Sequence, residues 1–296
     1  MTDSILTSLA VLTRIVSNPL GNVLQKQLTA KGHPALLVNF LTYGLLALGC
    51  LVISVFIPWP ELPPQFWMFS LLGGFTGAIG NGFLVKALQT GQLSVLGPIN
   101  AYKSVVGLLM GILLLGEVPS VWGLLGILFI ILGSYGVLDT TPERFTWALL
   151  QKREIQYRIL ALVLTAIEAV LVKKVILASS PFIAFMSWCW FGTLFSGLLG
   201  WVNQRFGKPA IRPIRPTDWG KYGLLILSIG LMQLTTNYTL AHMPVGYALA
   251  LFQLSTLVSV LLGHRIFQEP AIRKKLIGSL IMLIGSIIII LFNQAG

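Results

Sequence analysis

Apolar runs of about twenty residues, separated by short polar breaks, recur along the whole chain. A bilayer core about 30 Å thick is crossed by a helix of roughly 20 apolar residues, so each run predicts one membrane-spanning helix. Together the runs predict an all-α integral membrane protein with ten transmembrane helices. The runs are residues 5–24, 35–57, 66–85, 93–115, 121–138, 159–176, 182–202, 222–240, 245–262 and 276–292.

The composition agrees with a membrane protein and leaves no room for a soluble domain. Of the 296 residues, 55% are hydrophobic and 10% are charged, whereas about a quarter of the residues in a soluble domain are charged. The opening MTDS has no basic segment, and its apolar run leads into further runs. We therefore expect a first transmembrane helix there and not a cleaved signal peptide. Functional polar residues should then lie within or between helices.

The net charge of +11 reflects membrane topology. Lys and Arg concentrate at the ends of runs, above all in QKREIQYR, QRFGKPAIRPIRP and AIRKK. Because no soluble module presents a basic face to phosphates, we expect no nucleic-acid partner. Cys50 and Cys189 lie in apolar runs without CxxC or His-rich neighbours, which favours core positions over a disulfide or metal site. We expect neither a metal nor a cofactor.

The chain also contains an internal repeat. Glu117 precedes Gly126 by nine residues and Gly133 by sixteen, and the same spacing recurs 152 residues later, starting from Glu269. The runs thus form two copies of five. Because five is odd, the second copy enters the membrane from the opposite face, which predicts an inverted-topology repeat. The predicted parts are a first repeat at 1–138, a polar connection at 139–157 and a second repeat at 158–296.

Two inverted halves around a central site can expose that site to each side of the membrane in turn, which is the logic of a secondary transporter. The chain also resembles the EamA type of the drug/metabolite transporter superfamily. The matching features are Pro98, the Gly116–Glu117 pair followed by GLLGILFIILG, and the second copy QEPAIRKKLIGSLIMLIG, where Gln268 replaces the glycine. The resemblance implies ten spans, with the first four of each repeat lining a cavity and the fifth and tenth bracing the outside. Its substrates include amino acids, quaternary amines, sugars and nucleotide sugars.

Lys103 and Glu168 are the leading candidates for the site. A charge near the bilayer centre costs at least about 2.5 to 3.5 kcal/mol, so each should face a partner or water. Glu168 is the only acidic residue deep in a run. We expect both in one cavity, where they pair, or where Lys103 holds an anionic substrate group while Glu168 holds a cationic group or accepts a proton. The alternatives are a structural ion pair, or a lysine that reaches the membrane surface.

Other polar and aromatic residues within the runs are secondary candidates. Buried amides can instead form interhelical hydrogen bonds that stabilise the bundle by under about 1 kcal/mol each. Arg14 can reach the membrane interface, and aromatic residues often belong to the apolar core. Glu117 and Glu269 follow the fourth and ninth runs, and we expect them to cap the next helix rather than couple an ion. The further substrate-binding candidates are Arg14, Asn18, Tyr43, Asn81, Asn100, Trp188, Gln233, Asn237 and Gln253.

These residues predict a secondary transporter of a small polar metabolite, such as an amino acid or other zwitterion. Transport is driven by protons through Glu168, proceeds by exchange of solutes, or is facilitated diffusion. A flippase-like carrier of a lipid-linked substrate and a non-transporting membrane protein are the alternatives. No Walker-type phosphate loop, HExxH or GxSxG motif is present, so we expect no enzyme. We expect a multi-pass protein of a bacterial inner membrane. A small-residue stripe such as Gly73 with Gly77 allows a homodimer but also serves internal packing.

Two indications of orientation conflict. Lys and Arg concentrate in the odd-numbered loops, and the positive-inside rule then places those loops in the cytoplasm and both termini outside. The family resemblance implies the reverse, with both termini in the cytoplasm. We favour the charge rule for this chain because the bias is large.

Overall fold

The computed structural model describes residues 2–93, 96, 99–100, 102–116, 118, 120–138, 151–206, 215–269 and 272–292, and within these ranges the regular elements are all helices. The helices are α1 (Thr2–Ala30), α2 (Ala35–Ser54), α3 (Pro64–Thr90), α5 (Tyr102–Leu115), α6 (Val121–Leu138), α8 (Arg153–Leu177), α9 (Pro181–Phe206), the short 3-10 helix η1 (Pro216–Asp218), α10 (Trp219–His242), α11 (Val245–Phe252), α12 (Ser255–Phe267) and α13 (Ile272–Phe292).

Proline and left-handed residues mark several helix ends. Pro64 and Pro181 open α3 and α9, where the fixed φ of proline suits the first turn and its missing N–H costs nothing. Gly116 follows α5 with a φ of 68°, and Gln268 follows α12 with a φ of 54°. These two residues are 152 positions apart, so the turn is the same in both repeats although only one of them has the glycine that favours it.

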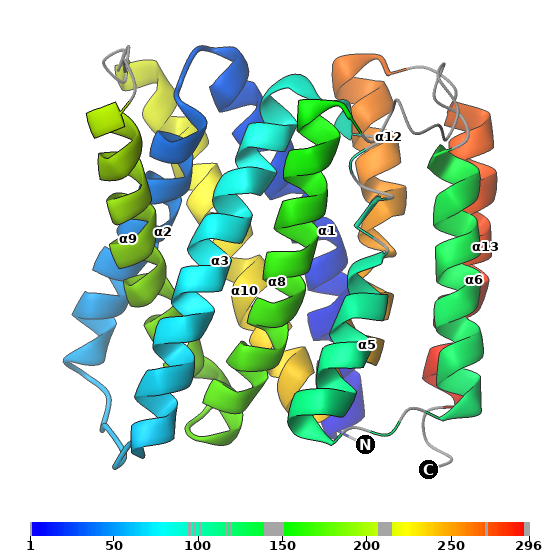
Figure 1. Cartoon of the computed structure of the whole chain (residues 1–296), viewed down its shortest axis with the longest axis horizontal. Helices are drawn as coiled ribbons and strands as arrows, with labels where there is room; N and C mark the ends of the chain where they lie inside the picture. Colours follow the sequence, from blue (N-terminus) through cyan, green and yellow to red (C-terminus); the bar gives the residue numbers. More distant parts are fainter. Residues whose placement is uncertain are drawn as a thin grey trace.

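The two halves of the bundle run in opposite directions. In Figure 1, α1 rises from the bottom while α8 descends from the top, and α13 ends at the bottom. Packed pairs of helices include α1 with α10, α3 with α8, α2 with α9 and α6 with α13. Exchanging the repeats converts the first pair into the second and leaves each of the other two unchanged. The α6–α13 pair stands at the edge of the bundle in Figure 1, outside the other helices.

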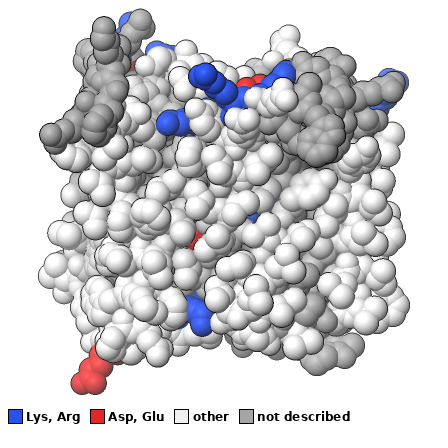
Figure 2. Space-filling model, viewed as in Figure 1, with Lys and Arg blue, Asp and Glu red and all other residues white. Residues whose placement is uncertain are grey.

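The exterior is apolar, as lipid requires. By length and composition, five described segments can cross a membrane: Ala35–Ser54, Pro64–Thr90, Pro181–Asn203, Pro216–His242 and Val245–Phe267. Large aliphatic side chains such as Leu113, Leu227 and Ile277 are exposed. Figure 2 shows the middle of one face mostly white, with most of the Lys and Arg along its upper edge. A surface of this kind is stable only in an apolar solvent.

Two predicted helices differ from the expectation of continuous spans. The ninth run is divided into α11 and α12 at Gln253, and in the fourth run α5 begins only after a turn at Asn100. At both breaks the backbone closes a shorter loop, because Lys103 N–H donates to Asn100 O at 2.9 Å and Thr256 N–H donates to Gln253 O at 2.8 Å. These i to i+3 bonds replace the α-helical ladder at the two turns.

Candidate functional site

A polar cavity of about 70 Å³ lies between the two repeats. A water molecule needs about 10 to 15 Å³ of such space, so the cavity has room for several. Its apolar wall includes Leu84, Met232 and Phe252. Its polar lining residues are Arg14, Asn18, Asn22, Asn81, Asn100, Lys103, Arg158, Thr165, Glu168, Gln233 and Thr236.

Lys103 and Glu168 both line this cavity, from α5 and α8 respectively. Glu168 is 7% exposed, and its Oε1 accepts a hydrogen bond from Trp188 Nε1 at 2.6 Å. Among the described residues, the ion pairs closer than 4 Å do not include one between Lys103 and Glu168. The two charges therefore share the cavity without closing on each other, which leaves both able to meet a ligand.

A chain of aromatic and amide side chains leads from Glu168 to three other helices. The ring of Trp188 packs on that of Tyr43 with centroids 4.5 Å apart, and Asn81 Nδ2 donates to the Tyr43 hydroxyl at 2.7 Å. This chain of contacts joins α8, α9, α2 and α3. Tyr43 and Trp188 are outside the cavity lining, so the structure does not place them in the ligand space that the sequence predicted for them.

The remaining amides divide into two groups. Asn18, Asn81, Asn100 and Gln233 line the cavity. Asn237 is fully buried outside it and donates to Pro181 O at 3.0 Å, which joins α10 to α9. Gln253 also lies outside the lining. Its Oε1 accepts from Asn100 Nδ2 at 3.3 Å, so the breaks in the fourth and ninth runs meet. Asn237 and Gln253 thus act as interhelical contacts, the alternative considered for these amides.

Arg158 is a lining residue that the sequence interpretation missed. It is 6% exposed, and its Nε donates to Leu96 O at 2.8 Å. The sequence predicts that QKREIQYR is a basic loop segment, but α8 begins at Arg153 and includes Arg158. The signal was available, because Arg158, Ala161, Thr165 and Glu168 follow at intervals of three and four residues and so share one helix face.

Arg14 lies inside the bundle rather than at an interface. It is 7% exposed, its Nε donates to Thr236 Oγ1 at 2.9 Å, and its guanidinium carbon lies 4.7 Å from the centroid of Phe252. Its Nη1 is buried and has no hydrogen-bond partner among the described residues. Arg14 thus brings an unused donor to the cavity wall.

The Glu269 side chain makes contacts with the other repeat. Its Oε1 accepts from Leu93 N–H at 2.8 Å and lies 3.4 Å from Lys26 Nζ, which also donates to Gly91 O at 2.8 Å. The carboxylate therefore fastens α12 to α1 and to the start of the fourth run. Glu117, its counterpart, lies outside the described residues.

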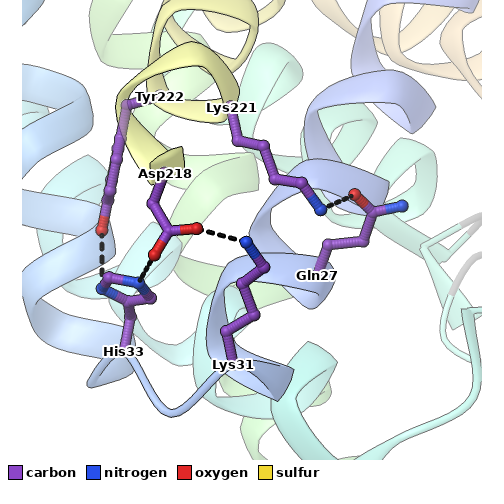
Figure 3. A network of polar contacts seen from close by, with 6 residues as sticks. All are labelled: Gln27, Lys31, His33, Asp218, Lys221 and Tyr222. Atoms are coloured by element: carbon purple, nitrogen blue, oxygen red, sulfur yellow. Dashed lines mark hydrogen bonds and ion pairs between the residues drawn. The ribbon is translucent and has the colours of Figure 1, made fainter. Parts of the chain in front are cut away.

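A polar network joins the two repeats where α1 ends and α10 begins (Figure 3). Asp218, which is 2% exposed, pairs with Lys31 and contacts His33 Nε2 through Oδ2 at 3.1 Å. Tyr222 and Lys221 extend the network to His33 and to Gln27, the latter at 2.8 Å. These contacts tie the connection between α1 and α2 to the start of α10, and hence one repeat to the other.

We expect Asp218→Asn to loosen this end, because a neutral amide keeps one acceptor and loses the charge that holds Lys31. A cysteine introduced at Asn22, on the cavity wall of α1, should then react severalfold faster with a thiol reagent added from that side. Glu61→Gln, an exposed change elsewhere, is the control and should leave the rate unchanged. An unchanged rate in Asp218→Asn would show that the network does not hold this end closed.

Comparison with known proteins agrees with this architecture. A solved crystal structure has the same fold, with a TM-score of 0.74 over 98% of each chain at 15% sequence identity. Two Streptococcus pyogenes proteins, from serotypes M6 and M1, are each named "Putative sugar uptake protein" and are 33% identical over 109 residues. That match covers 35% of this chain and only 37% of each relative. The profile of the EamA-like transporter family matches twice, over residues 8–139 and 152–291. The chain therefore belongs to the EamA-like transporter family.

Proposed function

We propose that this protein is a secondary transporter that moves a small polar metabolite by alternating access around the cavity between its repeats. The observation that carries the proposal is the polar, charged cavity enclosed by two halves that run in opposite directions. In this proposal the repeats are residues 1–138 and 158–296, joined by 139–157. They supply ten crossings of a bacterial inner membrane.

The breaks in the fourth and ninth runs support a substrate site at this cavity. Transporters commonly bind substrate where discontinuous helices meet near the middle of the bilayer, because the breaks free backbone groups and small dipoles. Here the breaks at Asn100 and Gln253 meet through their amides, and Asn100 lines the cavity. A small movement of either half-helix changes the shape of the site, so binding and conformation are coupled.

Glu168 supports coupling to a proton or to an exchanged solute. It is the acidic residue among the described cavity-lining residues. Gaining a proton would change the charge of the cavity by one unit and would replace the acceptor of the Trp188 N–H by a weaker one. A proton bound here therefore alters the affinity of the cavity for a charged ligand, as coupled transport requires.

The lining of the cavity suits more than one kind of polar solute. Amides such as those of Asn18 and Gln233 can both donate to and accept from hydroxyl groups, as a sugar of the kind named for the streptococcal relatives would need. Lys103 and Glu168 together can meet the two charges of an amino acid or other zwitterion. Both kinds of solute therefore belong in the first screen.

The test is a thermal-shift screen of the purified protein against amino acids, quaternary amines, sugars, nucleotide sugars and polyprenyl phosphates. A ligand at one hundred times its Kd should stabilise the folded state by about 2.7 kcal/mol. We expect a small polar solute to raise the Tm of the wild type and of the control Lys274→Ala but not that of Lys103→Ala, and the shift should change in Glu168→Gln because that variant removes the carboxylate of the described lining. The same solute should enter proteoliposomes.

Other outcomes would contradict the proposal. Equal stabilisation of the wild type and both cavity variants would place the ligand elsewhere and make the two charges structural. Binding of polyprenyl phosphates alone would favour a flippase-like carrier. A bound solute that does not cross the membrane would remove the transport function while leaving the binding site.

A further inference from the structure

The cavity carries an unbalanced charge. Three cationic side chains, those of Arg14, Lys103 and Arg158, face one carboxylate, that of Glu168, among the described lining residues. At neutral pH this is a formal excess of two positive charges. Because isolated charges are costly inside a membrane, such an excess is expected only where a partner of opposite charge is supplied.

The hydrogen bonds shown for the cations do not neutralise them. Arg14 Nε donates to a threonine hydroxyl at 2.9 Å, and Arg158 Nε donates to a backbone carbonyl at 2.8 Å. Both acceptors are neutral. Among the described residues, Arg14 Nη1 has no hydrogen-bond partner and Lys103 takes part in no ion pair closer than 4 Å. The guanidinium groups are thus oriented through Nε, and other nitrogens remain available to an anion.

Glu168 does not neutralise the three cationic side chains of the cavity. Its Oε1 is engaged by Trp188 Nε1, and Gly77 packs closely against its carboxylate. A carboxylate held in this way keeps a fixed place in the wall and compensates at most one of the three cations. The remaining charge has to be met by something that enters the cavity.

We propose that the substrate is a small dianion. Arg14, Lys103 and Arg158 bind the oxygens of its phosphate group or of its carboxylate groups. The inference rests on the proposed function, because it takes this cavity to be the transport site. Guanidinium groups match such oxyanions in geometry and form strong, charge-assisted bonds with them. Asn18, Asn81 and Gln233 then contact the uncharged part of the molecule. A zwitterion leaves the excess of charge in place, and a cation increases it.

The test uses pairs of solutes that differ in charge: glucose 6-phosphate with glucose, and succinate with succinamide, together with inorganic phosphate. Binding to the purified full-length protein is measured by thermal shift and by calorimetry, and uptake is measured in proteoliposomes. We expect at least one charged member to bind and its neutral partner not to bind. The phosphate and carboxylate pairs distinguish the two sources of the oxyanion.

Substitutions of the cavity residues test whether the anion binds in the cavity. Arg14→Gln and Arg158→Gln should each weaken binding of the anion about ten- to a hundredfold, the effect of losing a hydrogen bond to a charged group. Arg158→Lys, which keeps the charge, should recover part of the affinity and guards against misfolding of the glutamine variants. Lys274→Gln removes an exposed charge outside the cavity lining and should bind as the wild type does.

The outcomes separate this inference from the function on which it rests. Uptake of a neutral or zwitterionic solute that depends on Glu168, with no anion bound at millimolar concentration, overturns the dianion and leaves the transporter. An anion that binds through Arg14 and Arg158 but is not taken up supports the anion site and removes the transporter. Anion binding that is equal in the wild type and the glutamine variants overturns the inference.

Discussion

Replacing Gly77 with alanine is expected to abolish transport, because the new methyl group would overlap the carboxylate of Glu168. Gly77 lies on α3 where that helix packs against α8. To make room, the carboxylate must move, and its hydrogen bond from Trp188 at 2.6 Å would be lost or lengthened. A hydrogen bond to a charged group contributes about 1.5 to 3 kcal/mol, so stability should fall by a similar amount.

The matched control lies one turn away on the same helix. A Cβ added at Gly73 would come 3.6 Å from Leu171 Cβ, an ordinary van der Waals contact. Gly73→Ala should therefore fold and transport as the wild type does. Both variants are compared by uptake in proteoliposomes and by Tm. Transport by Gly77→Ala at the wild-type rate would show that the position of Glu168 is not important.

Replacing Gly133 with alanine is expected to separate the outer helices α6 and α13. An added Cβ would collide with the backbone carbonyl of Gly278, which cannot rotate away as a side chain can. Overpacking of this kind typically costs about 1 to 3 kcal/mol. The repeat supplies the same contact again, because Gly285 approaches Gly126 O in the same way. Gly285→Ala should therefore have a similar effect.

Gly136→Ala is the control for this interface. Its Cβ would lie 3.8 Å from Gly278 Cα, which is normal contact, and alanine is favoured over glycine in a helix by about 0.5 to 1 kcal/mol. Thermal unfolding in detergent should thus separate Gly133→Ala, with a lowered Tm, from Gly136→Ala, with an unchanged or raised one. Equal Tm values would show that α6 and α13 do not need this close approach.

The sequence was informative where its pattern is periodic. Apolar runs and the spacing of 152 residues predicted a helical protein of two repeats, and the turns at Gly116 and Gln268 have the same left-handed conformation in the structure. Mean hydropathy does not detect a helix break inside an apolar run. The breaks at Asn100 and Gln253 depend on which amide meets which, and that is decided by tertiary contact.

Residues of the site were predictable only where a charged side chain interrupts an apolar run of the sequence. Lys103 and Glu168 were evident because each interrupts an apolar run, and the structure brings both to the cavity. Arg158 sits near a helix end where charges are expected, so only helical phase could have revealed it. The contact of Asp218 with His33 joins residues 185 apart, and local sequence carries no signal for it.

The central claim is that one cavity serves both sides of the membrane, and a single cysteine tests it most directly. Thr165 lines the cavity, while the native Cys50 and Cys189 are buried. Thr165→Cys is reconstituted in vesicles and treated with a membrane-impermeant thiol reagent, added in separate samples to the outside or the inside. Alternating access predicts that the cysteine reacts from both sides and that substrate slows both reactions. Reaction from one side only, or from neither, would contradict the account.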